Sequence, residues 1–214
     1  IIGYAELLGD LAGDDLGEEA RSMLGVIERN AARELRLVND LLDLASLAGR
    51  LAAGEASGSG ERVAIADVVG GCVEATAAEA ADRDLVLVTT LDEAERLEVL
   101  GEPERLRQAL TNVVGNALKF TGPGGRVEVG ARREGEQVVI TVRDTGIGIE
   151  PEELPRIFDR LHRAPEAVRR QIPGAGLGLT IARAIVEGHG GTAEAASEPG
   201  VGTVVRLSLP AAPR

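Results

Sequence analysis

Apolar residues recur through the first fifty positions at the spacing of an amphipathic α-helix. Residues 1–11 carry this pattern, residues 12–17 (AGDDLG) have the composition of a turn, and a long helix is predicted over 18–48. Two helices alone cannot bury its apolar seam well, so we expect a dimer that forms a four-helix bundle. The alternative is a hairpin packed against its own chain. The seam residues stand three or four apart: Leu24, Ile27, Ala31, Leu35, Val38, Leu42 and Ala45.

The pattern changes after residue 48. Residues 49–61 (GRLAAGEASGSGE) are small and rich in Gly and Ser, so they predict a linker between the hairpin, 1–48, and a second domain, 62–210. That domain alternates predicted strands and helices, with a helix at about 67–81, another at 103–119 and a third in LGLTIARAIVEGHG. Strands are expected on both sides of Glu134-Gly135-Glu136 and in a final hairpin. The fold class is therefore α+β: a helical hairpin followed by an α/β sandwich, with helices on one face of a mixed, largely antiparallel sheet.

Composition narrows the class of protein. Apolar residues make up 44% of the 214 residues, which is enough for a core, and no apolar run approaches the roughly 18–20 residues of a membrane helix. The net charge of −12 argues against a nucleic-acid surface. A single cysteine, Cys72, excludes an internal disulfide and is expected in the core. The chain opens inside an apolar pattern without Met, so we interpret it as part of a longer polypeptide, with no membrane contact in the part given.

The helix 103–119 has a polar stripe on an otherwise apolar pattern. Asn112 and Asn116 are four residues apart and share a face, and Lys119, the only lysine, lies three residues further on. An amide oxygen suits Mg²⁺, and a lysine supplies a point charge for a phosphate oxygen. This face is suited to a metal–triphosphate, although a solvated polar stripe has the same pattern.

Two glycine clusters differ in what they can bind. The cluster DTGIGI follows a strand, but no helix with a phosphate-loop spacing comes after it, and the acidic stretch Glu150-Pro151-Glu152-Glu153 follows instead. Asp144 is an acceptor, so this loop is suited to the amine of a base; a plain Gly turn is the alternative. The cluster GAGLGL, at 174–179, opens a helix, where backbone N–H groups bind phosphate. The segment between them carries five arginines and has the composition of a mobile basic cover.

The order of these motifs resembles a known family. Asn-x-x-x-Asn-x-x-Lys-Phe-Thr, DTGIGI, IFDRLHR, GAGLGLTIARAIVEGHGG and GVGTVVRLSLP are similar to the N, G1, F, G2 and G3 boxes of sensor histidine kinases, in their GHKL-type catalytic ATP-binding domain of the Bergerat fold. The hairpin, with IIGYAELL and LVNDLLDLASL, resembles the family's dimerisation and phosphoacceptor domain.

The resemblance implies roles for individual residues. Asn116 ligates Mg²⁺ with support from Asn112, and Lys119 contacts phosphate. Asp144 accepts from the adenine amine, and an arginine of the ATP lid, Arg163, reaches the γ-phosphate, so Asn116, Lys119 and Arg163 are the implied catalytic residues. The other implied nucleotide contacts are Phe120, Gly146, Gly148, Ile149, Phe158, Arg160, Gly174, Gly176, Leu177, Gly178, Leu179 and Thr203.

The implied activity is phosphoryl transfer from Mg-ATP to a histidine and then to an Asp of a response regulator, in the cytoplasm. The family's acceptor motif, a His followed by an acidic residue and a Pro, is absent, and the resemblance places it upstream of Ile1. His162 lies in the implied lid and His189 after the last helix, and we expect neither to be the acceptor.

Two other classes remain as alternatives. Related ATPases that hydrolyse ATP use a Glu four residues before the metal-binding Asn, as a base for water. Asn112 stands there, and an amide cannot take that proton, which also counts against the anti-sigma serine kinases. A pseudokinase scaffold that binds a regulator without transfer is the second alternative.

Overall fold

The computed structural model describes all residues except 1–2, 5–7, 9–16, 53–59, 92–96 and 214. The chain divides into two compact units, Ile1–Asp43 and Leu44–Arg214. The expected first helix and turn, 1–17, lie largely outside the described residues, as does most of the expected linker. The long helix α2 runs from Glu18 to Ala52, four residues beyond the expected end. Arg50, Leu51 and Ala52 are good helix formers, and a single Gly49 costs a helix only about 1 kcal/mol.

The apolar seam of α2 is largely uncovered in the described residues. The exposed fractions of four seam side chains are 47% for Ile27, 51% for Leu35, 52% for Val38 and 64% for Leu42. Ala31, in contrast, is buried. None of the described helices is both long and apolar enough to span a bilayer.

The second unit is built on a five-stranded sheet in the order β2-β4-β5-β7-β6. Its strands are β2 (Val86–Leu91), β4 (Arg126–Glu134), β5 (Gln137–Asp144), β6 (Thr192–Glu198) and β7 (Gly202–Pro210). β2 pairs with β4 in parallel, and the other pairs are antiparallel. The expected mixed, largely antiparallel sheet is confirmed.

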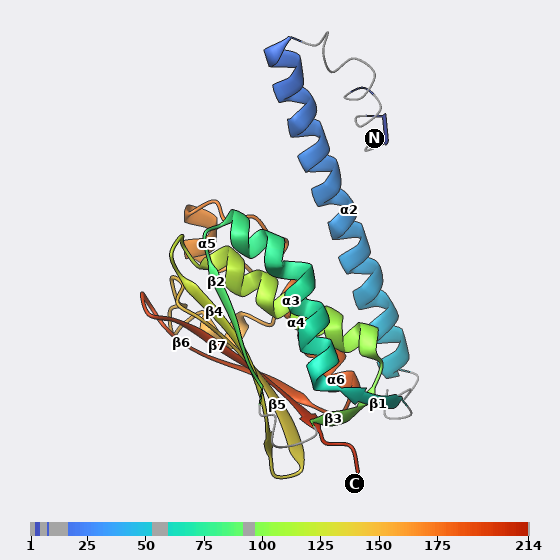
Figure 1. Cartoon of the computed structure of the whole chain (residues 1–214). Helices are drawn as coiled ribbons and strands as arrows, with labels where there is room; N and C mark the ends of the chain where they lie inside the picture. Colours follow the sequence, from blue (N-terminus) through green and yellow to red (C-terminus); the bar gives the residue numbers. More distant parts are fainter. Residues whose placement is uncertain (1–2, 5–7, 9–16, 53–59, 92–96, 214) are drawn as a thin grey trace. The chain divides into compact units, whose positions relative to one another are not determined.

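Three helices cover one face of this sheet (Figure 1): α3 (Ile65–Asp82), α4 (Pro103–Phe120) and α6 (Gly178–Gly188). Strand residues that point toward the helices, such as Val127, Val129 and Ile140, are fully or almost fully buried. The apolar side of α4 completes the core between them: Leu106, Ala109, Leu110, Val113, Val114, Ala117 and Leu118. The core therefore fixes α4 in rotation, and with it the polar side of that helix.

A second, two-stranded sheet pairs β1 (Glu61–Ala64) with β3 (Glu98–Gly101) in antiparallel fashion. Between the two glycine clusters the chain forms a short 3₁₀ helix, η2 (Leu154–Arg156), and the five-residue helix α5 (Pro165–Arg169). Sequence periodicity did not predict either one, because both are too short to show a period.

Candidate functional site

The polar side of α4 lies opposite its buried face. Pro103 occupies the first turn, where its missing N–H is not needed, and the helix ends at Phe120. Asn112, Asn116 and Lys119 are all half-buried, as expected for side chains at the edge of a site rather than on an open surface. Asn112 reaches the start of α6, because a Cβ added at Gly178 would lie 3.8 Å from its Oδ1. The N-box helix and the second glycine cluster therefore meet.

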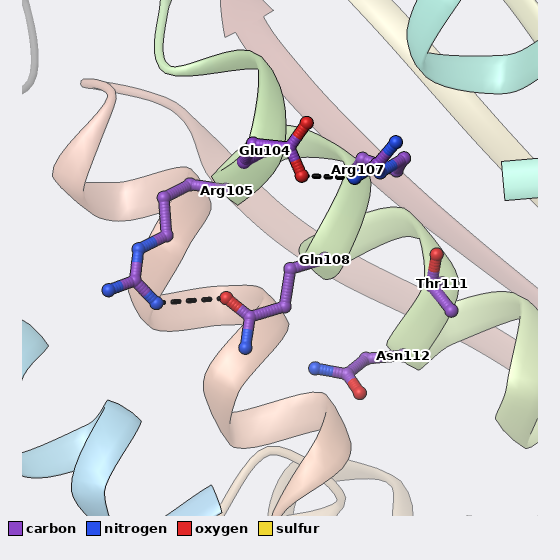
Figure 2. Close-up of a pocket in the computed structure, with 6 residues that line it drawn as sticks. All are labelled: Glu104, Arg105, Arg107, Gln108, Thr111 and Asn112. Carbon is purple, nitrogen blue, oxygen red and sulfur yellow. Dashed lines mark hydrogen bonds and ion pairs between the residues drawn. The ribbon is translucent and has the colours of Figure 1, made fainter. Parts of the chain in front are cut away.

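A pocket of about 360 Å³ opens along the N-terminal half of α4 and ends at Asn112 (Figure 2). Arg105 donates to the Gln108 side chain at 3.0 Å, and Arg107 pairs with Glu104. Thr111 completes the lining, and the pKa of the Cys72 thiol beside it is raised by burial, against a smaller opposing effect of the Thr111 hydrogen bond. Cys72 is a free, buried core residue, as expected.

Asp144 ends β5 as a buried carboxylate with a defined orientation. Its Oδ1 accepts two backbone hydrogen bonds, from Gly146 N–H at 2.8 Å and from Thr203 N–H at 3.2 Å. Burial raises the pKa of this carboxyl, and the two N–H donors partly oppose that rise. Within the described chain both bonds end on Oδ1, so Oδ2 is left as an acceptor for a ligand. This is the arrangement expected of a residue that receives an amine.

The loop after Asp144 is in close backbone contact with α4 and with the β6–β7 hairpin. Ile147 N–H donates to the carbonyl of Phe120 at 3.2 Å, and a Cβ at Gly146 would overlap that same carbonyl. Gly148 has a φ of +68°, and a Cβ there would overlap the carbonyl of Glu198. Both glycines are required by close approach of another backbone, and neither has the phosphate-loop setting that precedes a helix.

Ser197, near the end of β6, joins this loop to β7 and was not singled out by sequence reasoning. Its hydroxyl accepts from Ile149 N–H at 2.9 Å, donates to the Gly202 carbonyl at 2.8 Å, and lies 2.8 Å from Thr203 Oγ1. A serine in a strand has no distinguishing sequence signal. Two of its partners depend on the register of the β6–β7 hairpin, and the third, Ile149, is 48 residues away.

The expected lid, between the glycine clusters, is joined by two hydrogen bonds to residues around the start of α6. Leu161 N–H donates to the Gly176 carbonyl at 3.0 Å, and Thr180 Oγ1 donates to the Phe158 carbonyl at 3.0 Å. Arg163 donates to the carbonyl of Ile172 at 2.6 Å, inside the lid. Arg160 is exposed. One of the five N–H groups of the Arg163 guanidinium is therefore engaged within the lid.

The first turn of α6 is free of competing groups. Leu177 is its N-cap residue, there is no side-chain cap, and the turn carries no acidic residue. The first N–H groups of a helix have no partner within it, so those of Gly178 and Leu179 can bind an anion. Leu177 is almost fully buried and so holds this turn against the core. Gly174, at the start of the cluster, has open space around it, because no heavy atom lies within 4 Å of a Cβ added there.

Both histidines are engaged in hydrogen bonds of the fold, which does not favour either as a phosphoryl acceptor. His189 is buried; its Nδ1 donates to the Ile185 carbonyl at 2.7 Å, and its Nε2 accepts from Glu102 N–H at 3.1 Å. His162 bonds through Nε2 to Glu153 at 2.8 Å, and the exposed fractions of the two side chains are only 11% and 20%. His189 thus links the end of α6 to the start of α4, and His162 links two parts of the lid.

Two family descriptions match the chain. Residues 101–213 match "Histidine kinase-, DNA gyrase B-, and HSP90-like ATPase", and residues 1–50 match "His Kinase A (phospho-acceptor) domain". The chain belongs to the sensor histidine kinase family. The expected family and the expected α+β fold are both confirmed.

Curated histidine kinases and sensor proteins align along nearly the whole chain. Circadian input-output histidine kinase CikA of Synechococcus elongatus is 32% identical over 211 residues, which is 98% of this chain and 28% of CikA. Sensor protein DivL of Caulobacter vibrioides is 35% identical over 210 residues, 98% of this chain and 26% of DivL. Sensor-like histidine kinase SenX3 of Mycobacterium tuberculosis is 33% identical over 212 residues, 98% of this chain and 50% of SenX3. This chain therefore spans half or less of the length of these relatives.

Two solved structures that resemble this chain are sensor histidine kinase MprB and full-length ShkA. A mycobacterial sensor histidine kinase, MprB, has a TM-score of 0.62 and 32% identity, covering 72% of this chain and all of that one. Full-length ShkA, solved in complex with AMPPNP, has a TM-score of 0.77 and 28% identity, covering all of this chain and 43% of that one.

Proposed function

We propose that this chain is the ATP-binding, phosphoryl-transferring core of a two-component histidine kinase. The observation that carries the proposal is that both glycine clusters contact α4, the helix of Asn112, Asn116 and Lys119. The polar side of α4 touches the first turn of α6 through Asn112 and Gly178, and the end of α4 touches the Asp144 loop through Phe120 and Ile147. A base acceptor, metal-suited amides and an anion-binding helix start thereby border one site.

Asp144 is proposed to read the adenine base through Oδ2, with Gly146, Gly148 and Ile149 shaping the loop around it. Thr203 lies beside it on β7, because its N–H donates to Asp144 Oδ1. Phe120, the last residue of α4, borders the ribose or base.

Magnesium suits the donors on α4. In the described parts of the chain there is no group of three or more His, Cys, Asp or Glu residues that could hold a metal, so no all-protein cage is available there. Mg²⁺ favours a few oxygen ligands from protein, completed by phosphate and water. The amide oxygen of Asn116 would hold it, with Asn112 in support. When bound, the ion neutralises charge on the phosphates.

We assign the phosphates to Lys119 of α4 and to the first turn of α6. Lys119 supplies a positive charge from the last turn of α4. Gly178 and Leu179 are the first residues of α6, and their N–H groups are proposed to bind phosphate. The first turn carries no acidic residue, and Leu177 before it is buried. Gly174 and Gly176 shape the loop that leads to this turn. The lid residues Phe158, Arg160 and Arg163 cover the site, and Arg163 would leave the Ile172 carbonyl to meet the γ-phosphate. These groups orient ATP and offset the charge that develops during transfer.

The proposed reaction breaks the bond between the γ-phosphorus and its bridging oxygen and forms a phosphorus–nitrogen bond on a histidine. The phosphoryl group then passes to an Asp of a response-regulator receiver domain. The exposed seam of α2 supports a second copy of the chain as the partner in a four-helix bundle. The catalytic portion is proposed to work in the cytoplasm, where ATP is supplied.

Calorimetry with an unhydrolysable ATP analogue, with and without Mg²⁺, tests the site. We expect Mg-dependent binding by the wild-type chain and its loss in Asn116→Ala. Asn39→Ala is the matched control, because Asn39 is an exposed asparagine on helix α2. Equal affinity in Asn116→Ala and the control would contradict the assignment of the metal site.

A further inference from the structure

Ser197 and Thr203 face each other as paired residues of β6 and β7, beside the base acceptor Asp144. We propose that Ser197 is a positioning residue for adenine selectivity, which it exerts by fixing the direction of the Thr203 hydroxyl. The inference rests on the proposed ATP site and adds a residue that no motif identified.

The hydrogen bonds of Ser197 leave one possible arrangement of protons. A serine hydroxyl has one proton to donate and two lone pairs to accept with. The Gly202 carbonyl, at 2.8 Å, can only accept, so it takes the serine proton. Ile149 N–H, at 2.9 Å, can only donate, so it takes one lone pair. The remaining 2.8 Å contact is therefore a hydrogen bond that Thr203 donates to Ser197.

This arrangement makes Thr203 an acceptor toward any ligand. Its single hydroxyl proton is committed to Ser197, and only lone pairs of Oγ1 remain. Asp144 is likewise an acceptor toward a ligand, because both N–H groups that bind its carboxylate donate to Oδ1 and leave Oδ2. Thr203 and Asp144 adjoin through the Thr203 N–H, at 3.2 Å from Oδ1.

Two adjoining acceptors select the chemistry of the base edge. An exocyclic amine carries two protons and can satisfy both acceptors, directly or through a water. A carbonyl at the same place, as in guanine or hypoxanthine, meets two acceptors and no donor. A site built to bind a donor rejects the analogue that lacks it, because its own polar groups are left unpaired.

Loss of the Ser197 hydroxyl releases the Thr203 proton. In Ser197→Ala the Thr203 hydroxyl can rotate and donate to a carbonyl, so guanine and hypoxanthine nucleotides should be tolerated better. We expect the preference for ATP over GTP and over ITP to fall by about tenfold, the weight of one hydrogen bond. Ser197→Thr keeps a hydroxyl and should keep the preference.

The test is competition of ATP, GTP and ITP against a fluorescent ATP analogue, with Mg²⁺ at pH 8, on the full 214-residue chain. Ser208→Ala is the matched control, because Ser208 is a half-buried serine of β7 that pairs with Thr192 at the far end of the same ladder. Thermal unfolding of each variant verifies that it is folded.

A double-mutant cycle separates positioning from a general packing effect. Thr203→Val removes the hydroxyl through which Ser197 acts, so Ser197→Ala should change selectivity in the wild-type background and not in Thr203→Val. If the ATP-to-GTP ratio is unchanged in Ser197→Ala, or falls equally in both backgrounds, the inference is overturned while the ATP site stands. If Ser197→Ala does not fold, Thr203→Val alone decides: unchanged selectivity there overturns the inference. A wild-type chain that binds no nucleotide overturns the proposed function and the inference together.

Discussion

Substitution of Asp144 by Asn should reverse the hydrogen-bonding sense of the base site, not merely weaken it. Two backbone N–H groups converge on Oδ1, from Gly146 at 2.8 Å and Thr203 at 3.2 Å. In the variant the amide oxygen must occupy that position, because the amide nitrogen would face two donors. The NH₂ group then takes the place of Oδ2, and a donor faces the ligand where an acceptor stood.

The magnitude follows from one unpaired buried donor. Leaving such a group without a partner costs about 1–3 kcal/mol, so ATP should bind roughly 5- to 150-fold more weakly. GTP should lose nothing and gain an interaction, because its carbonyl accepts from the new amide. The ATP-to-GTP ratio should therefore fall by at least as much as the ATP affinity.

The assay is competition binding of ATP and GTP at pH 8, with Asp67→Asn as a control that removes the same charge from the exposed first turn of α3. The stability of Asp144→Asn helps to interpret the result. Burial raises the pKa of Asp144 in the folded chain, so its charge destabilises the fold above that pKa, and this cost disappears as the pH falls to the unfolded value. The variant should be at least as stable as wild type at pH 8. A variant that is folded and still prefers ATP as strongly as wild type would refute the reasoning.

Four further outcomes are expected. Acidification should weaken ATP binding as the pH falls through the raised pKa of Asp144, because protonation removes the acceptor, and titration of Asp144→Asn across the same pH range should show no such fall. Gly176→Ala should lower the melting temperature and the ATP affinity more than Gly124→Ala. The φ angles are +72° at Gly176 and +75° at Gly124, so both substitutions cost about 1–2 kcal/mol of backbone strain. Of the two, only the new Cβ at Gly176 would overlap a carbonyl, that of His162. Leu35→Glu combined with Leu42→Glu should convert a dimer into a monomer by light scattering, whereas Asn39→Asp should not; a wild-type monomer would disprove the bundle. Incubation with labelled ATP should leave His162 and His189 unlabelled, because both histidines are held by the hydrogen bonds of the fold; label on either one would contradict the assigned site.

Long periodic elements could be predicted from the sequence, and α4 shows why. Its apolar positions at three- and four-residue spacing fixed a helix predicted over 103–119 and observed over Pro103–Phe120, and they fixed which side is buried. The placement of Asn112, Asn116 and Lys119 on the other side follows from that periodicity alone.

The contacts that complete the site could not be predicted in the same way. Ser197 bonds to Ile149, 48 residues away, and that contact depends on the register of β6 against β7. Helix α5 has five residues, which is too short for a period, and the end of α2 at Ala52 is a matter of local propensity against a Gly-rich composition. Periodicity reports on burial, whereas these features arise from tertiary approach or from local backbone energetics.

The part of the lid between Leu161 and Gly176 can change in length without displacing its two ends. The hydrogen bond between Leu161 and Gly176 closes the segment at its base, at 3.0 Å, so residues added between them would extend the lid without moving either end. The entropy of closing a flexible loop grows only with the logarithm of its length, and a doubling costs about 0.6 kcal/mol. Insertions near the tip should therefore leave α6 and the loop after Asp144 in place. A reporter peptide or a second recognition sequence could be grafted there.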